Sequence, residues 1–223
     1  VPPISYLAGA VATGQTLNLL VPFRSGDVTR VLMIEGRKWT AAGTIAVEKA
    51  VDSAFFAAVC LTLPLVWVVP DSLEEPRVTA VAVSAVLLLA GFLVVPRLPR
   101  MGIRLTPRSF GILIASSSLI WSGSLLNNYL VLRFLNLDLP WIAPVVLLVI
   151  LQVGTAVPST PGKVGVFQAL AVLGLSFFGV SSTPAIAFGL VLHALVLFPV
   201  AIMALIFWIF RTKWRTFKLR QSL

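Results

Sequence analysis

The chain has 223 residues, of which 58% are hydrophobic and only 11% are charged, and its 17 lysines and arginines exceed its 8 acids to give a net charge of +9. An average globular chain carries about 25% charged residues. With a mean hydropathy of +1.00, the low charge excludes an ordinary soluble domain and a disordered chain. The single cysteine, Cys60, excludes an internal disulfide framework and a multi-cysteine zinc site. The cations lie between and after long uncharged stretches, so they favour cytoplasmic loops and anionic lipid headgroups over nucleic acid as partners.

Long stretches without charge predict the membrane segments, because a spanning helix needs about 20 apolar residues. They cover residues 1–23, 53–70, 78–96, 109–132, 139–162 and 164–210. The last stretch must contain two segments, since residues 179–184 are a cluster of helix breakers, and we therefore expect about seven segments. The first residue is not methionine and already lies in an apolar run, so we expect a fragment that lacks upstream spans.

Loop charge predicts the orientation of these segments, because cytoplasmic loops carry an excess of lysine and arginine. Residues 97–108 carry four arginines and no acid, the tail after Phe210 carries five cations, and the connection 71–77 is acidic on balance. We expect helices over about 41–69 and 109–132 to run outward, and those over 78–96 and 185–210 to run inward. The sequence therefore predicts a multi-pass protein of the cell membrane with a cytoplasmic basic tail.

Two segments end in Pro/Gly breakers, one after residues 4–21 and one after residues 139–157. An offset of 136 aligns Val21-Pro22-x-x-x-Gly26 with Val157-Pro158-x-x-x-Gly162, a weak internal repeat with unit A over about 4–69 and unit B over about 139–210. If each breaker marks a re-entrant hairpin, three spans separate the units and the repeats are inverted, an arrangement that places binding sites near the bilayer midplane. The alternative is that residues 139–157 and 164–179 are ordinary short spans, which the loop charges also fit.

The predicted fold class is thus an all-α integral membrane protein. We expect one transmembrane domain over residues 1–223, a polytopic helical bundle of about 5–7 membrane segments. Two of its helices are broken by Pro and Gly and are re-entrant if the first reading of the breakers holds.

The first group of candidate site residues surrounds the first breaker: Asn18, Arg24, Gly26, Asp27 and Arg30. Free amide groups at a helix start bind anions, and arginine grips phosphate oxygens with paired hydrogen bonds. Asp27 and Arg30 are three residues apart, so they can pair on one helix. The alternative is a juxtamembrane loop whose arginines meet lipid headgroups without specificity.

The second group consists of Glu48, Lys49 and Asp52, inside an otherwise apolar run. The i, i+4 spacing puts both carboxylates on one helical face. Such charges at membrane depth are costly and normally find partners in the bundle interior. They predict a site that holds a cation or proton, or that orients an arginine of the first breaker; the alternative is an internal ion-pair staple between helices.

The third group follows the second breaker, where Gly162 and Lys163 adjoin Ser159 and Thr160. Lys163 is the one formal charge between Leu139 and Phe210, which predicts either a ligand of lipid phosphate or a side chain that snorkels to the interface. His193, the single histidine, is expected to be a packing residue more often than a ligand. No residue pattern indicates a metal site or a cofactor.

These groups resemble the transmembrane region of lysylphosphatidylglycerol synthases and related flippase-like membrane proteins, from about Ala8 to Phe207. The resemblance rests on three motifs: Asn18…Pro22-x-Arg24-x-Gly26-Asp27-x-x-Arg30, then Glu48-Lys49-x-x-Asp52, then Pro158-x-x-Pro161-Gly162-x-x-Gly165. The chain has Asp27 where the family often has Glu, Lys49 where it often has Arg, and Gln168 where a glutamate commonly follows the Pro-Gly loop. The first two departures keep the charge, and the third removes an acid.

The resemblance implies a membrane module that binds, and in some members translocates, phospholipids or polyprenyl-linked lipids. Arg24, Arg30, Lys163, Asn18, Gly26 and Gly162 would then hold an anionic headgroup, and Asp27, Glu48, Lys49 and Asp52 would position those cations or couple to an ion. The alternatives are the membrane half of an aminoacyl-phospholipid synthase or glycosyltransferase system, with a soluble transferase domain as partner, or an accessory subunit of a larger membrane complex. An ion-coupled transporter is a further alternative that Glu48 and Asp52 would suit. We expect no catalysis from this segment alone.

Overall fold

The computed structural model describes most of the chain as helices joined by loops, with no strand among the described residues. The described residues are 4–21, 25–34, 38–68, 71, 75, 78, 81–82, 85–86, 88–89, 98–100, 103, 106–156 and 160–221, without the side chains of 64, 156, 161 and 211–221. The predicted segment 78–96 lies largely outside them, although its described residues are helical.

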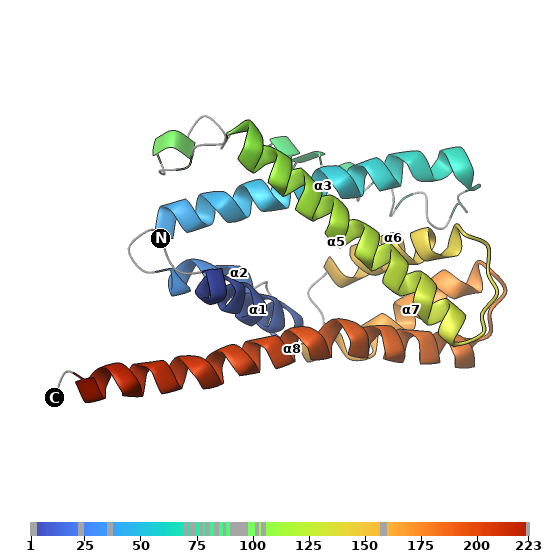
Figure 1. The fold of residues 1–223 in the computed structure, drawn as a ribbon. Helices are drawn as coiled ribbons and strands as arrows, with labels where there is room; N and C mark the ends of the chain where they lie inside the picture. Colours follow the sequence, from blue (N-terminus) through green and yellow to red (C-terminus); the bar gives the residue numbers. More distant parts are fainter. Residues whose placement is uncertain are drawn as a thin grey trace.

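The helices are arranged along the chain as Figure 1 shows. In chain order they are α1 (Ile4–Leu20), α2 (Ser25–Met33), α3 (Lys38–Val66), α5 (Pro107–Phe134), α6 (Ala143–Ala156), the 3₁₀ turn η2 (Pro161–Lys163), α7 (Val166–Ser176) and α8 (Ser182–Gln221). An all-helical architecture satisfies the backbone within each segment, as a lipid environment requires.

Two of these helices are long and apolar enough to cross a membrane, α5 and the Ser182–Phe210 part of α8. Both correspond to predicted segments, 109–132 and 185–210. α3 matches the predicted segment 41–69 in length but carries Glu48, Lys49 and Asp52 along its first half. α8 continues through the basic tail as one helix to Gln221.

Local sequence explains where the two long apolar helices begin. Thr106 caps α5: its hydroxyl accepts a hydrogen bond from the Ser109 amide, the Ser109 hydroxyl accepts one from the Thr106 amide, and Pro107 occupies the first turn. α7 ends at Ser176 and α8 begins at Ser182 with Pro184 in its first turn. The predicted break at residues 179–184 therefore separates two helices.

Consecutive helices form two antiparallel hairpins. In the first hairpin, α1 and α2, the Tyr6 hydroxyl near the start of α1 donates to the Met33 carbonyl at the end of α2 at 2.6 Å. In the second hairpin, α6 and α7, an added Cβ on Gly154 would meet Leu170, and one on Gly174 would meet Leu147. Each hairpin is thus closed by contacts at both ends of its arms.

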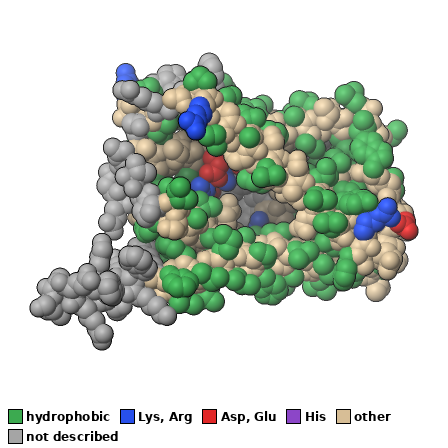
Figure 2. Space-filling view, viewed as in Figure 1, with side chains coloured by type: hydrophobic (Ala, Val, Ile, Leu, Met, Phe, Trp, Pro, Cys, Tyr) green, Lys and Arg blue, Asp and Glu red, His purple; other side chains and the backbone are tan. Residues whose placement is uncertain are grey.

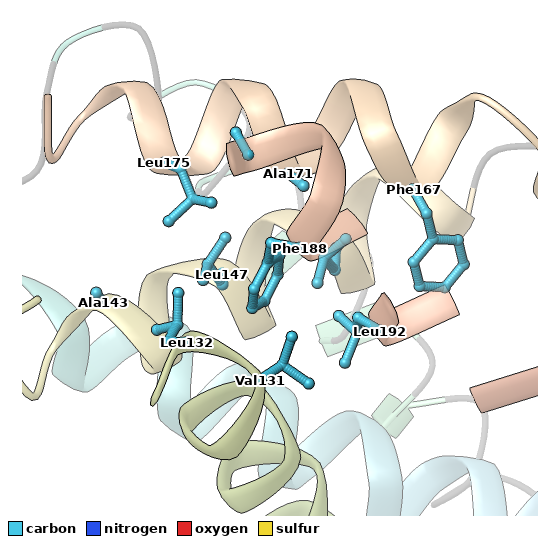
Figure 3. Packing of buried hydrophobic residues seen from close by; sticks show 11 residues of the cluster. Val131, Leu132, Ala143, Leu147, Phe167, Ala171, Leu175, Phe188 and Leu192 are labelled. Atoms are coloured by element: carbon cyan, nitrogen blue, oxygen red, sulfur yellow. The ribbon is translucent and has the colours of Figure 1, made fainter. Parts of the chain in front are cut away.

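The main hydrophobic core lies where the second hairpin meets α5 and α8 (Figure 3). Leu147 of α6, Ala171 of α7 and Phe188 of α8 are fully buried, and Val131 and Leu132 close the cluster from the end of α5. A second cluster packs Phe56 and Cys60 of α3 against α6. These clusters fix the second hairpin between α3, α5 and α8.

α8 joins the two hairpins, because it packs against both α1 and α7. Phe207 lies so close to Gly9 that an added Cβ would sit 2.0 Å from the ring, and the Trp208 indole donates to the Thr13 hydroxyl at 3.1 Å. Near its other end, Gly189 lets α8 approach the backbone of α7. α8 runs along the length of the molecule beside both hairpins (Figure 1).

Large apolar side chains remain exposed along α5 and α8. Leu119 and Ile120 of α5 and Phe198 and Leu205 of α8 are each at least 60% exposed. Soluble proteins rarely expose contiguous apolar surface on this scale. These faces indicate contact with lipid.

Candidate functional site

The first breaker is built around a close crossing of α1 and α2 at two glycines. A Cβ added to Gly26 would lie 1.8 Å from the Gly14 carbonyl oxygen, and one added to Gly14 would lie 2.5 Å from Cγ of Arg30. Real Cβ atoms do not approach this closely. The two glycines therefore let the backbones touch and let the Arg30 stem lie against α1.

Asn18 connects the end of α1 to the start of α2. Its Oδ1 accepts from the Gly26 amide at 2.9 Å, and its Nδ2 donates to Asp27 Oδ1 at 3.3 Å. The first amides of a helix lack partners within the helix. Asn18 therefore accepts the hydrogen bond of the Gly26 amide, a donor expected from the sequence to bind an anion. It also fixes the position of Asp27.

Arg30 is buried, with 8% of its surface exposed, and is held by acids from two elements. Its two terminal nitrogens donate to both oxygens of Glu48 on α3, at 3.1 and 2.7 Å, and Nη1 lies 3.6 Å from Asp27 Oδ1. Paired hydrogen bonds of this kind are strong and directional. Glu48 thus orients an arginine that follows the first breaker.

The remaining charges of α3 extend this ion group toward α5. Lys49 Nζ lies 3.9 Å from Glu48 Oε1, and Asp52 Oδ1 accepts from the Ser117 hydroxyl of α5 at 3.3 Å. Three acids therefore accompany Arg30 and Lys49 among the described residues. Arg24 lies outside the described residues.

At the second breaker, the backbone turns through residues with positive φ. Gly162, Lys163 and Gly165 have φ of 68, 53 and 84°. This conformation costs little for glycine and is uncommon for lysine. Pro158 and Ser159 lie outside the described residues.

The Lys163 ammonium lies at the end of α6, where its Nζ donates to the Thr155 carbonyl at 2.8 Å. The last carbonyls of a helix lack partners within it and carry partial negative charge. Lys163 is half-buried there, and it caps α6 while η2 lies against α1. α1 therefore contacts both α2 and η2, so both breakers lie next to the same helix.

Figure 2 shows that this face of the molecule is hollowed near its centre, with acidic and basic side chains gathered beside the hollow and hydrophobic side chains over most of the remaining surface. A further pair, Arg133 and Asp138, is exposed at the end of α5. The Arg133–Asp138 pair is thus separate from the ion group of Asp27, Arg30, Glu48, Lys49 and Asp52. Among the described residues, no three metal-ligating side chains come together.

Two polar residues that the sequence did not assign to the site, His193 and Gln168, lie where α7 and α8 pack together. The His193 ring of α8 is 7% exposed and stacks on Phe167 of α7 with ring centroids 4.5 Å apart and planes 2° from parallel. The His193 ring lies near the Gly162 backbone and near the charge of Lys163. Gln168 follows Phe167 and has a buried Oε1. The contact depends on how α7 packs on α8, and the sequence signal for it is Gly189, one turn before His193.

Comparison with protein families identifies one part of the chain. Residues 95–204 match the family model described as the lysylphosphatidylglycerol synthase TM region. The matched range contains α5 to η2, α7 and most of α8, whereas the Asn18–Arg30 and Glu48–Asp52 motifs precede it. No curated protein and no solved structure matches the chain.

The family match confirms the resemblance predicted from the sequence, over residues 95–204, which are similar to the lysylphosphatidylglycerol synthase TM region. Together with the two apolar helices of spanning length, the match indicates a membrane protein of a family related to lipid modification.

Proposed function

We propose that the chain is a flippase-like module of the cell membrane that binds an anionic phospholipid or polyprenyl-linked lipid by its headgroup and assists its passage across the bilayer. The observation that carries the proposal is that both breakers adjoin α1, so the charges of the first and the glycine-rich turn of the second border one region. Polar groups at membrane depth mark a substrate path.

The two hairpins act as inverted, re-entrant repeats in this proposal. α1 ends at Leu20 and α6 at Ala156, so the ends of the first arms keep the offset of 136, whereas the second arms α2 and α7 begin at Ser25 and Val166, 141 residues apart. α6 and α7, with 14 and 11 residues, are about 21 and 16 Å long, well below the roughly 30 Å of the hydrocarbon core. These lengths favour re-entry over spanning and support repeat units over about 4–69 and 139–210.

Headgroup binding is assigned to the cations and to the glycine-rich turns. Lys163 and Arg24 contact the phosphate directly, and Gly162 lets the backbone come close to it. Gly26 acts only through the close packing of α2 on α1, because its amide donates to Asn18. Arg30 exchanges one carboxylate oxygen of Glu48 for a phosphate oxygen, since guanidinium makes the same paired bonds to either group. Lys49, 3.9 Å from Glu48, then keeps that acid paired, and Asn18 and Asp27 hold the start of α2.

Orientation and coupling complete the proposal. The basic tail faces the cytoplasm because of its excess of cations. Asp52, which contacts α5 through Ser117, is the acid to which an ion or proton would couple.

The test is lipid binding and scrambling by the purified protein in liposomes that contain a fluorescent phosphatidylglycerol. Lys163→Ala and Arg30→Ala are expected to lower binding at least about tenfold each, the loss of one charge-assisted contact, and to slow scrambling in parallel. Arg133→Ala is the matched control, since it removes an exposed cation that pairs with Asp138. Unchanged binding and scrambling in both site variants would show that the site is assigned wrongly.

A further inference from the structure

The contact between η2, α7 and α8 contains two buried hydrogen-bond acceptors that have no partner among the described residues. They are Nε2 of His193 and Oε1 of Gln168. Leaving a buried acceptor unpaired is costly, and such groups in native structures normally have a partner. A hydroxyl or ammonium donor of a bound ligand would satisfy both atoms.

α7 and α8, which carry the two acceptors, pack tightly against each other. A Cβ added to Gly189 would lie 2.8 Å from Cα of Gln168, so the backbones of α7 and α8 touch there. His193 follows Gly189 by four residues and therefore lies on the same face of α8. The parallel stack on Phe167 fixes the plane of the imidazole.

The chemistry of the two atoms defines what they can bind. The Gly162 backbone lies close to the His193 ring, and Nε2 is the ring nitrogen that has no partner among the described residues. When Nδ1–H donates to a carbonyl, Nε2 of the neutral ring is an acceptor. Gln168 Oε1 is also an acceptor, so the missing group is a donor, a hydroxyl or an ammonium rather than a phosphate oxygen.

The two acceptors belong to a region that borders the protein surface and Lys163, the residue proposed to bind phosphate. Val164 and Gly165, which follow Lys163 at the start of α7, are exposed. Lys163 itself interacts electrostatically with His193. A ligand that reaches both would carry its phosphate near Lys163 and its donors near α7 and α8.

We infer that His193 and Gln168 form a second subsite, which recognises the hydroxyl or ammonium donors of a polar lipid headgroup whose phosphate lies at Lys163. The inference rests on the proposed function for the phosphate part, while the donor preference rests on the two acceptors alone. It makes the headgroup specificity of the module a property of α7 and α8.

The experiment measures binding to vesicles of matched composition that differ only in the test lipid. Phosphatidylethanolamine is compared with phosphatidylcholine, which has the same charge but no N–H donor, and phosphatidylglycerol is compared with phosphatidylmethanol, a phosphodiester of the same charge that lacks the glycerol hydroxyls. The wild-type protein is expected to prefer the donor lipid of at least one pair by about fivefold or more, the effect of one or two hydrogen bonds. No preference in either pair overturns the inference.

Variants assign the preference to the two acceptors. Gln168→Leu and His193→Phe are expected to abolish the preference while binding of the lipid without donors stays unchanged. Gln168→Glu keeps an acceptor, so it should retain the preference, and a carboxylate would favour ammonium over hydroxyl. Because His193→Phe also changes the stack on Phe167, Gln168→Leu with an unchanged melting temperature is the decisive variant; if it keeps the full preference, the subsite is wrong.

The same vesicles separate this inference from the proposed function. Phosphatidylmethanol binding that does not depend on Lys163 counts against the phosphate site, whereas the subsite stands if the donor preference still depends on Gln168. If Lys163→Ala loses phosphatidylmethanol binding but the wild-type protein shows no donor preference, the phosphate site stands and the subsite is wrong. If Gln168→Leu weakens the binding of all four lipids equally, Gln168 has a structural role and the subsite is wrong.

Discussion

Arg30 illustrates how one residue organises the first half of the molecule. Its stem lies against Gly14, its guanidinium makes two bonds to Glu48, and Asp27 stands 3.6 Å from Nη1. A buried cation is tolerated only when it is paired and hydrogen-bonded. The Arg30 side chain therefore contacts α1, α2 and α3 and fixes the positions of these helices relative to one another.

Replacing Glu48 with Gln is expected to destabilise the protein by about 2 kcal/mol, because Arg30 loses its charged partner while staying buried. The value lies below that of a fully buried pair since the Glu48 side chain is 31% exposed. Thermal unfolding in detergent, followed by circular dichroism, measures the change. Asp138→Asn is the control, because it removes the acid of the exposed pair with Arg133 and should cost no more than about 0.5 kcal/mol. Equal effects in both variants would contradict the structural role of the Glu48 contact.

At the scale of elements, the two hairpins reach their close packing by different means. α1 and α2 touch through the Gly14 and Gly26 backbones, whereas α6 and α7 pack leucines onto Gly154 and Gly174. Small residues at a crossing allow helices to associate in lipid, where no hydrophobic force draws them together. The first hairpin has therefore the less adaptable contact.

Gly26→Ala is expected to destabilise the protein by about 2 kcal/mol or more, since the new Cβ would meet a carbonyl oxygen rather than a side chain that can move. The melting temperature of the purified variant in detergent measures it. Gly123→Ala is the matched control in α5, where an added Cβ meets nothing within 4 Å, so it should be neutral or stabilise by up to about 1 kcal/mol. A neutral Gly26→Ala would mean that α1 and α2 can separate at no cost.

Helix positions follow largely from the sequence, because uncharged length and breaker residues are local signals. The start of α5 at Thr106 and Pro107 and the break before α8 illustrate this. An acid at membrane depth must also find a cation, which made an arginine near Glu48 predictable. Gly14 as the partner of Gly26, and Phe167 as the ring that stacks on His193, depend on how helices pack against one another. No spacing within the sequence encodes those contacts.

At the scale of the whole molecule, the two interpretations of the second breaker differ in where Thr160 lies. If α6 and α7 are ordinary spans, residues 157–163 reach the cytoplasmic surface. If they are re-entrant, this turn stays near the bilayer midplane, where irregular backbone survives only when protein or a water-filled cavity surrounds it. Thr160 is exposed in the structure and the native Cys60 is fully buried, so a cysteine at position 160 reports on this difference with little background.

Thr160→Cys and Arg108→Cys are labelled in inside-out vesicles with a bulky, membrane-impermeant maleimide. Thr160→Cys is expected to react at least about tenfold more slowly, because re-entrant helices of about 21 and 16 Å cannot carry the turn across roughly 30 Å of hydrocarbon. Arg108 is exposed at the start of α5, in the arginine-rich connection that loop charge assigns to the cytoplasm. Asp138→Cys, exposed beyond the end of α5, controls for sidedness and should react only from the opposite face. Equal labelling of positions 160 and 108 would show that α6 and α7 span the membrane, and it would remove the basis for inverted repeats while leaving the headgroup contacts of Lys163 open to the liposome test.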